Sequence, residues 1–369
     1  MAILSHQDRV DWLRLIRTRN VGPATFSSLL AQFGTAARAL EALPELARRG
    51  GRHGGIQPSG RGEAEAEITA AQRLGANYVA IGEPDYPPAL AACEAPPPLL
   101  CIKGALHLLQ RPAIAIVGAR NASAAGIRMA GDLAHALGQQ NLLIASGLAR
   151  GIDAAAHQGA LQSGTCGVLA GGIDVVYPPQ NDKLQKRMGE IGVLISELPP
   201  GTQPQARNFP QRNRIISGIS LAVIIIEAAH RSGSLITARN AGEQGREVLV
   251  VPGSPLDPRS QGGNALIRQG ATLVQNAEDV LEAVRPLLRR PFREPDAFIQ
   301  PPLPAAPDMA ALNTARRDIL EKLGPTPVEI DELLRQTGHS PAIIATILLE
   351  LDLAGRLERL PGQRVALMA

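Results

Sequence analysis

Cysteine is scarce in this chain and its spacing suggests no covalent or metal framework. The three cysteines, Cys93, Cys101 and Cys166, form no Cys-x-x-Cys pair and no cysteine–histidine cluster with zinc spacing. An odd number of widely separated cysteines argues against the disulfide framework of small secreted domains and against a structural zinc site. The sequence therefore predicts free thiols in a reducing compartment and no bound metal.

Long apolar runs are missing as well. The first residues, MAILSHQDRVDWLRLIR, contain no signal-peptide core, and no later run approaches the length of about 18 apolar residues that a membrane helix needs. These absences predict a cytoplasmic protein that makes no membrane contact. The charge is nearly balanced, with 37 Lys and Arg against 34 Asp and Glu. Such a mild positive excess permits nucleic acid as a partner without requiring it.

The stretch from Ala113 to Asp153 is the most informative part of what is present. An apolar run, Ala113–Val117, ends in Gly118-Ala119-Arg120, and helical spacing of apolar residues begins near Gly126. A second apolar run, Leu142–Ala145, ends in Ser146-Gly147. Unbroken apolar strands joined by helices are typical of a parallel sheet that is buried on both faces.

The same alternation of strand and helix continues to about Arg285. The predicted strands are Ala113–Val117, Leu142–Ala145, Thr165–Ala170, Val193–Ser196, Ala222–Glu227, Glu247–Val251 and Ala271–Val274. Helices are predicted at Asp153–Gln162, Asp182–Met188, Ser234–Glu243, Gly263–Gln269 and Ala277–Val284. With right-handed crossovers, this pattern predicts a doubly wound α/β fold with a mostly parallel sheet.

Five clusters of small, hydroxyl and basic residues lie at or just beyond predicted strand ends. The first holds Gly118, Arg120, Ser123 and Gly126, the second Ser146, Gly147, Arg150 and Gly151, the third Gly171, Gly172, Tyr177 and Lys183, the fourth Phe209, Arg212, Asn213 and Arg214, and the fifth Ser232, Gly233, Ser234 and Thr237. If the sheet is parallel, these clusters meet at one edge, where doubly wound proteins bind ligands. Glycine turns, helix starts and arginines together favour a phosphate ligand.

Common nucleotide motifs are not found. Gly118 and Gly126 are eight residues apart, which is not the spacing of a Gly-x-Gly-x-x-Gly dinucleotide fingerprint. No Gly-x-x-x-x-Gly-Lys-Ser/Thr phosphate loop is present either. The sequence therefore disfavours a nicotinamide dinucleotide and ATP hydrolysis by that route, and no cofactor is expected.

The flanking segments differ from the central one. Residues 1–82 are predicted to be a small helical domain, in which a helix, a Val-Gly-Pro-Ala-Thr turn and a second helix resemble a SAM or helix-hairpin-helix unit. Residues 83–285 form the Rossmann-like domain, and the proline-rich residues 286–307 form a linker. Residues 308–369 read as three helices and a hairpin, a winged-helix pattern. The third helix, near Ser340–Ala354, carries no Lys or Arg, which disfavours major-groove reading and favours a packing or partner-binding surface.

The clusters lie in motifs that, taken together, resemble one family. The motifs are IVGARNASAAG, SGLARGID, GVLAGGIDVVYPPQN, FPQRNRIISGIS, EAAHRSGSLITARNA, VPGSP and QGGNALIRQGA, in this order between Tyr86 and Val274. They look like the DNA-processing protein A (DprA/Smf) family, and the flanking domains also fit. The resemblance implies an extended Rossmann domain that binds single-stranded DNA as a homodimer. It also implies that the protein protects incoming strands in natural transformation and loads the RecA recombinase onto them.

The resemblance also implies which residues contact DNA. The family's motif arginine falls on Arg120, and its basic groove residues fall on Lys183, Arg212 and Arg214. Sequence-independent strand binding combines a basic groove with aromatic platforms, yet Phe, Trp and Tyr make up only 2% of this chain. Phosphate contacts should therefore outweigh stacking, and binding should depend strongly on salt.

An enzymatic alternative remains open at this point. Residues Ser232–Thr237 lie where related phosphoribohydrolases carry a Pro-Gly-Gly-x-Gly-Thr-x-x-Glu motif. The glutamate is missing here, because Arg239 and Asn240 follow in its place. Hydrolysis would lack that base, so a non-catalytic DNA-binding protein is expected and a nucleotide-processing enzyme is the alternative.

Overall fold

The computed structural model describes residues 3–288, 309–360 and 362–368. These residues divide into two compact units. One unit holds residues 67–288, and the other combines residues 4–66 with the described residues from 309 onwards. The predicted 286–307 linker lies almost entirely outside the described residues.

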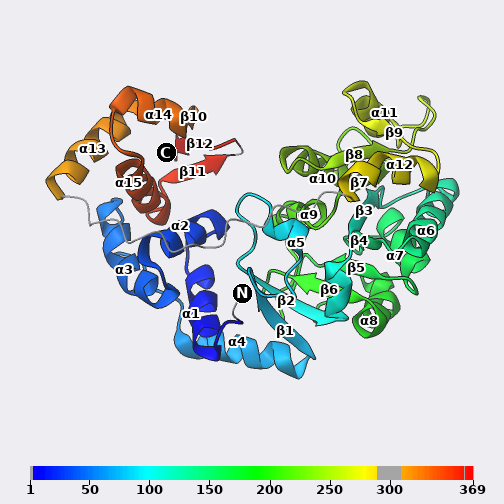
Figure 1. Ribbon diagram of the computed structural model, residues 1–369, viewed down its shortest axis with the longest axis horizontal. Helices are drawn as coiled ribbons and strands as arrows, with labels where there is room; N and C mark the ends of the chain where they lie inside the picture. The colour runs from blue at the N-terminus through cyan, green and yellow to red at the C-terminus, as the bar shows by residue number, and fades with distance from the viewer. Residues whose placement is uncertain (1–2, 289–308, 361, 369) are drawn as a thin grey trace. The chain divides into compact units, whose positions relative to one another are not determined.

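The larger unit contains a nine-stranded sheet in the order β1-β2-β6-β5-β4-β3-β7-β8-β9 (Figure 1). Its strands are β1 Ala76–Ala80, β2 Leu99–Gly104, β3 Ala113–Gly118, β4 Leu143–Ser146, β5 Thr165–Val168, β6 Val193–Ser196, β7 Ala222–Ile226, β8 Glu247–Val250 and β9 Thr272–Leu273. All neighbouring pairs from β6 to β9 are parallel, whereas β1 and β2 pair antiparallel with their neighbours. The mostly parallel α/β fold predicted from the sequence is confirmed.

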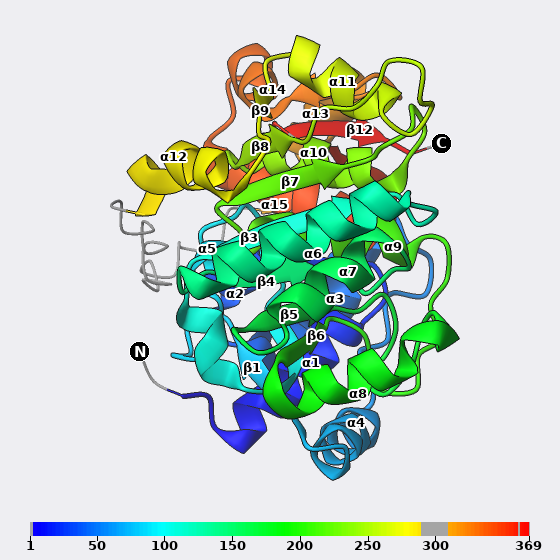
Figure 2. The same cartoon turned by 90° about the vertical axis from the view of Figure 1, so that its right-hand side faces the viewer.

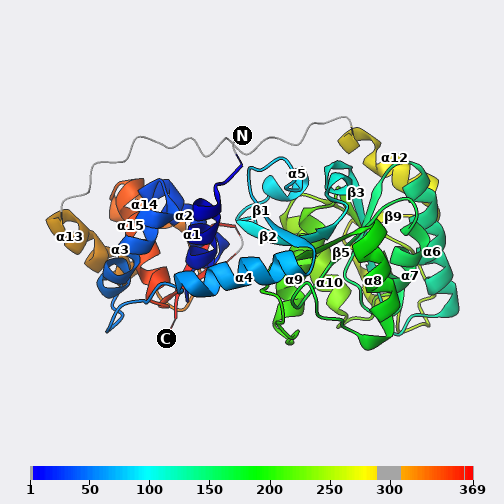
Figure 3. The same ribbon diagram turned by 90° about the horizontal axis from the view of Figure 1, so that it is seen from below.

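Helices cover both faces of this sheet. They are α5 Pro88–Ala91, α6 Ala124–Gln139, α7 Ile152–Ala160, α8 Asp182–Ile191, α9 Asn208–Gly218, α10 Gly233–Glu243, α11 Gln261–Arg268 and α12 Ala277–Leu288, with the short 3-10 helices η1 Leu106–Gln110 and η2 Pro179–Asn181. Helices α6 and α7 pack on one face, and α9 and α10 on the other (Figures 2 and 3). Strand β3 is wholly apolar because both of its faces are buried. Ala115 and Val117 pack in the hydrophobic core on one face of the sheet, and Ile116 packs in the core on the other face.

Two elements of this unit differ from the sequence prediction. Strand β1 had been placed with the helical residues 1–82, but it pairs with the unpredicted strand β2 in the large sheet. Helix α9 was also not predicted. Its sequence is mostly polar and contains Pro210, so it does not look helical. The helix forms nevertheless, because Pro210 falls in the first turn, where proline is tolerated, and Ile215 and Ile216 supply the buried face.

The smaller unit brings the two ends of the chain together. Its elements are α1 His6–Arg17, α2 Pro23–Phe33, α3 Ala36–Arg49 and the start of α4 Arg61–Arg73, followed by α13 Met309–Lys322, β10 Val328–Glu329, α14 Ile330–Thr337, α15 Pro341–Leu353, β11 Leu357–Leu360 and β12 Arg364–Leu367. The three C-terminal helices and the small antiparallel sheet β10-β12-β11 form the predicted winged helix. The second of the three predicted helices, α14, begins only at Ile330, because Val328 and Glu329 pair with β12.

Helix α15, the third helix of the winged helix, packs against α2 and α3. Leu349 and Leu353 belong to the core of the N-terminal helices, whereas other apolar residues of α15 belong to the winged-helix core. The Thr25 hydroxyl donates to Asp352 Oδ2 at 2.7 Å, and the Asn20 amide donates to the Leu353 carbonyl oxygen at 3.0 Å. The apolar third helix is therefore a packing element of its own chain, as its lack of Lys and Arg indicates.

Gly50 permits this packing, and an alanine there should disrupt it. A Cβ at position 50 would lie 1.9 Å from the Glu350 carbonyl oxygen. Because backbone must shift to relieve such an overlap, we expect Gly50→Ala to lower the free energy of unfolding of this unit by about 1–3 kcal/mol. The fluorescence of Trp12, the single tryptophan in the sequence, follows this unit during urea unfolding. Gly62→Ala is the control because a Cβ there meets nothing within 4 Å, and equal stability of the two variants would contradict the account.

Candidate functional site

A groove of about 920 Å³ lies at the carboxyl ends of the parallel strands. It draws on the first cluster through Gly118 and Arg120, on the third through Tyr177, on the fourth through Phe209, Arg212 and Asn213, and on the fifth through Ser232, Gly233, Ser234 and Thr237. The second cluster reaches it only through the intervening Ala149 and the following Asp153. The parallel sheet thus brings separate chain reversals to one edge, as the sequence predicts.

Arg120 is the most exposed of the predicted cations at this groove. It follows β3, and its Cζ lies 5.0 Å from the centroid of the Phe209 ring. The Phe209 ring in turn contacts Tyr177, with 5.5 Å between ring centroids and 55° between ring planes. A guanidinium held against an aromatic ring keeps its charge and its outward donors. Arg120 is therefore available to a phosphate group.

Arg212 plays a different part, although it lines the same groove. The residue is only 6% exposed, and its Nη1 donates to the Gly147 carbonyl oxygen at 2.5 Å and to the Val168 carbonyl oxygen. Burial lowers the pKa of Arg212 to about 10, against the opposing effect of Asp153. Burial also raises the pKa of Asp153, whose carboxylate accepts from the Gly147 amide and lies under the influence of Arg212. Arg212 thus ties together the ends of β4 and β5.

The two other basic residues implied by the resemblance do not line the groove. Arg214 pairs with Glu197 at 2.5 Å on another side of α9. Lys183 is exposed near the start of α8. That start is held to the strand-end loops because the Asn181 amide donates to the Leu148 and Ala149 carbonyl oxygens. Lys183 is therefore on the same edge of the sheet, beyond the groove.

Ser123 and Gly126, predicted as DNA contacts, do not line the groove either. The Glu227 carboxylate occupies the N-terminus of α6, where it accepts from the Ser123 amide at 2.8 Å and from the Ser123 hydroxyl. A Cβ at Gly126 would lie 2.7 Å from this carboxylate. The anion position at this first strand-to-helix turn is thus filled by a side chain of the protein.

The remaining predicted residues mostly shape the loops. Ser146 is fully buried, and its hydroxyl donates to the Ile116 carbonyl oxygen at 2.6 Å. Gly151 has a φ of 74°, and a Cβ there would lie 2.3 Å from the Ala119 carbonyl oxygen. Arg150 is exposed but is not part of the groove lining. The Asn213 amide joins α9 to α10 by donating to the Gly233 carbonyl oxygen at 3.3 Å.

Two cations at the groove were not singled out from the sequence. Arg231, which is exposed, and Arg259, which pairs with Asp257 at 2.8 Å, both line it. Arg231 directly precedes the fifth cluster, so its position in the sequence was the available signal. Arg259 lies in the loop after β8, between the VPGSP and QGGNALIRQGA motifs, and was not singled out because it belongs to neither.

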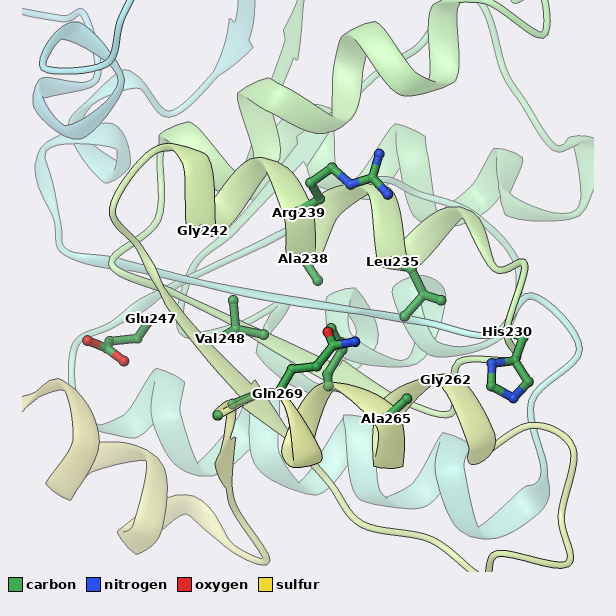
Figure 4. Close-up of a pocket in the computed structure, with 13 residues that line it drawn as sticks. His230, Leu235, Ala238, Arg239, Gly242, Glu247, Val248, Gly262, Ala265 and Gln269 are labelled. Carbon is green, nitrogen blue, oxygen red and sulfur yellow. The ribbon is translucent and has the colours of Figure 1, made fainter. Parts of the chain in front are cut away.

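A second groove, of about 600 Å³, lies between α10 and α11 beside β8 (Figure 4). Arg239 and Glu247 give it mixed charge, His230 also lines it, and it shares no lining residue with the first groove. Arg239, which replaces part of the phosphoribohydrolase motif, lines this second groove. Among the described residues, no group of three or more His, Cys, Asp or Glu is arranged to hold a metal ion.

His157, on α7, should make the stability of the protein depend on pH. Its ring is fully buried, its Nδ1 lies 2.7 Å from the Thr165 hydroxyl oxygen, and burial lowers its pKa from 6.5 to about 3, with the charge of Arg212 contributing. Between these values the unfolded chain binds a proton that the folded chain does not, so stability is lost as the pH falls, by roughly 1.4 kcal/mol per pH unit.

Urea unfolding between about pH 4 and about pH 7 measures this slope. His157→Gln should flatten it, whereas His135→Gln, at an exposed position on α6, should not. A slope that is the same in both variants would assign the acid sensitivity to other groups.

The fold and the groove define a class of protein: a doubly wound α/β domain with an arginine-bearing strand-end groove, accompanied by a helical domain and a winged helix. The family model described as DNA recombination-mediator protein A matches residues 77–285. Models of the DprA-like N-terminal helix-hairpin-helix domain and of the DprA winged helix domain match residues 6–70 and 303–363. The chain belongs to the DNA recombination-mediator protein A (DprA/Smf) family.

Individual relatives agree with this assignment. The chain is 39% identical over 286 residues to the Smf protein of Escherichia coli K12, covering 76% of this chain and 75% of that one. The crystal structure of DNA processing protein A from Streptococcus pneumoniae matches with a TM-score of 0.62 and 35% identity, covering 76% of this chain and 98% of that one. A Helicobacter pylori DNA processing protein A structure, whose description concerns its single-stranded DNA binding mode, matches with a TM-score of 0.52 and 28% identity, covering 57% of this chain and 96% of that one. No helix in the described part of the chain is long and apolar enough to cross a membrane.

Proposed function

We propose that this protein binds single-stranded DNA along the groove at the carboxyl ends of β3, β4 and β7, and does so without catalysis. In the cytoplasm it would protect strands taken up in natural transformation and load the RecA recombinase onto them, acting as a homodimer. The observation that carries the proposal is the exposed Arg120 guanidinium, held over Phe209 at the mouth of a groove that Arg231 and Arg259 also line.

The chemistry of the groove favours phosphate groups in sequence-independent contacts. The Ser232 and Ser234 hydroxyls bond to each other at 2.6 Å, whereas Arg120, Arg231 and Gly233, which begins α10, are exposed and line the groove. These donors match phosphate oxygens, which every nucleotide presents alike. The Helicobacter pylori relative is described by its binding of single-stranded DNA, which supports the same ligand here.

Asp153, which lines the groove, and Glu227, which does not, are both engaged in structure, and this supports a non-catalytic role. Asp153 accepts from two backbone amides beside Arg212. Glu227 accepts from Ser123 at the start of α6. A general base needs a carboxylate that is directed at the substrate, and neither residue offers one. Homodimer formation and contact with RecA rest on membership of the family, and the test of each is direct: light scattering for the dimer and pull-down of purified RecA for the partner.

Gel-shift titrations of the full chain test the binding proposal. Single-stranded and double-stranded DNA of one sequence are compared at two salt concentrations. We expect preference for the single strand and weaker binding at higher salt because phosphate contacts release counterions. Equal affinity for the two forms would contradict the proposal. Release of a free nucleobase from nucleoside monophosphates would instead support the phosphoribohydrolase alternative.

A further inference from the structure

We infer that the smaller unit carries a second contact for the phosphate backbone of single-stranded DNA, at a basic patch formed by Arg19, Arg52 and Arg356. Arg19 lies in the turn between α1 and α2, Arg52 in the glycine-rich loop after α3, and Arg356 shortly before β11. The choice of DNA as the ligand rests on the proposed function. The patch itself is separate, because none of its residues lines the groove of the larger unit.

Arg356 lies against the glycine-rich loop that carries Arg52. Its Nη1 donates to the Gly50 carbonyl oxygen at 3.3 Å. A Cβ at Gly51 would lie 2.9 Å from the same nitrogen, so glycine at this position permits the close approach. An arginine of the winged helix and an arginine that follows the N-terminal helices are therefore held at neighbouring positions.

The turn that carries Arg19 packs on the residues just before Arg356. The Asn20 amide donates to the Leu353 carbonyl oxygen at 3.0 Å, across 333 positions in the sequence. A Cβ at Gly355 would lie 2.9 Å from Asn20 Nδ2. Arg19 and Arg356 each adjoin one side of this contact, so the folded unit gathers three arginines that are widely separated in the sequence.

The patch offers hydrogen-bond donors at the surface. Arg19 and Arg356 are exposed, and Arg52 is partly exposed. In the described part of the chain, none of these three side chains forms an ion pair. The exposed His53 and Gly54 add two backbone amides that bond to no other group of the described residues. Guanidinium and amide N–H groups at a surface donate readily to phosphate oxygens.

The acids near the patch leave it with a net positive charge. Asp352 pairs with Arg359 at 2.9 Å, and Glu45 pairs with both arginines at the end of α3, at 2.8 and 3.0 Å. Glu358, on β11, is exposed and adds one negative charge beside the three positive ones. Since positive charge exceeds negative charge here, the patch attracts a polyanion.

A polyanionic strand suits this surface better than a stacked base or a free phosphate. The three segments 17–22, 50–55 and 353–358 contain no Phe, Trp or Tyr, so a base finds no such ring to stack on. A strand repeats its phosphates along its length, so several exposed contacts act together. The buried α15 does not prevent this contact, because Arg356 follows the helix and is exposed.

Anisotropy titrations of the full chain with a labelled thymidine oligonucleotide, over a range of salt concentrations, test the inference. We expect the double variant Arg19→Gln, Arg52→Gln to bind more weakly. Its slope of log affinity against log salt should be shallower by about 1.4, or about 0.7 for each lost phosphate contact. Neither side chain makes a hydrogen bond or ion pair within the described residues, so Trp12 fluorescence should show unchanged urea unfolding.

The matched control is the double variant Arg38→Gln, Arg317→Gln, which removes two exposed arginines of the same unit outside the patch. It should keep the slope of the unaltered protein. The inference is overturned if the patch variant also keeps that slope, or if the control loses as much. Arg120→Ala separates the two proposals: weakening by Arg120→Ala alone supports the groove and refutes the patch, and weakening by the patch variant alone does the reverse.

Discussion

Replacing Arg212 by methionine is expected to lower the free energy of unfolding by about 3–5 kcal/mol, because it leaves two strand-end carbonyl oxygens unsatisfied and a buried carboxylate without its neighbouring positive charge. The guanidinium is 6% exposed and donates to the carbonyl oxygens of Gly147 and Val168. Without it, the buried Asp153 carboxylate loses its nearby positive charge. We therefore expect this variant to lose stability at the carboxyl ends of β4 and β5, and any loss of DNA binding to be a consequence of that.

Two features distinguish this effect from loss of a phosphate contact. Burial, no longer opposed by Arg212, should raise the pKa of Asp153 further. The folded variant then holds a proton that the unfolded chain releases, so its stability falls as the pH rises above the usual aspartate range. Asp153→Asn in the same chain should restore part of the stability.

Urea unfolding followed by far-UV circular dichroism measures these changes. Arg207→Met is the matched control because Arg207 is exposed and immediately precedes α9. Normal stability of Arg212→Met, together with weakened DNA binding, would show that Arg212 acts on the ligand directly.

Arg316→Met is expected to destabilise the smaller unit by a similar amount, about 3 kcal/mol or more. The Arg316 guanidinium pairs with Glu350, which is fully buried on α15, the helix shared by the winged helix and the N-terminal helices. Burial raises the pKa of Glu350, and Arg316 is the main group that opposes this shift. Removing Arg316 leaves a buried carboxylate unpaired, and the free-energy penalty for this is larger than the net stabilisation that the ion pair provides.

The double variant Arg316→Met, Glu350→Leu should recover most of the loss, because an apolar pair of similar size needs no charge partner. Trp12 fluorescence reports the result, since Trp12 packs on Phe26 within this unit. Arg317→Met, at the next position on α13, serves as the control. A double variant no more stable than Arg316→Met would mean that the pair contributes through other contacts.

The sequence was most informative for the parallel strands, where an unbroken apolar run has a single structural cause. The strands were predictable because their runs are buried on both faces, as in β7, where all five residues Ala222–Ile226 are buried. Strand β2 was missed because it follows a proline-rich stretch and pairs antiparallel with β6, which the strand–helix alternation does not predict. Helix α9 was missed because polar residues occupy both its exposed and its buried positions.

The sequence predicted which loops meet at the candidate site, but it did not predict which side chains of those loops face the groove. Arg212 and Arg214 are two residues apart, yet one is buried against strand ends and the other pairs with Glu197. Ser123 meets Glu227 across 104 positions in the sequence, so no local pattern shows that this helix N-terminus is already filled. Such contacts depend on tertiary packing and become visible only in the folded chain.

The central claim is that phosphate groups of a single strand bind at the groove through Arg120. Anisotropy titrations of the full chain and of Arg120→Ala against one oligonucleotide, over a range of salt concentrations, test it most directly. The account predicts weaker binding by Arg120→Ala and a slope of log affinity against log salt that is shallower by about 0.7, the value for one phosphate contact on a single strand. The same slope and affinity in both proteins would contradict it.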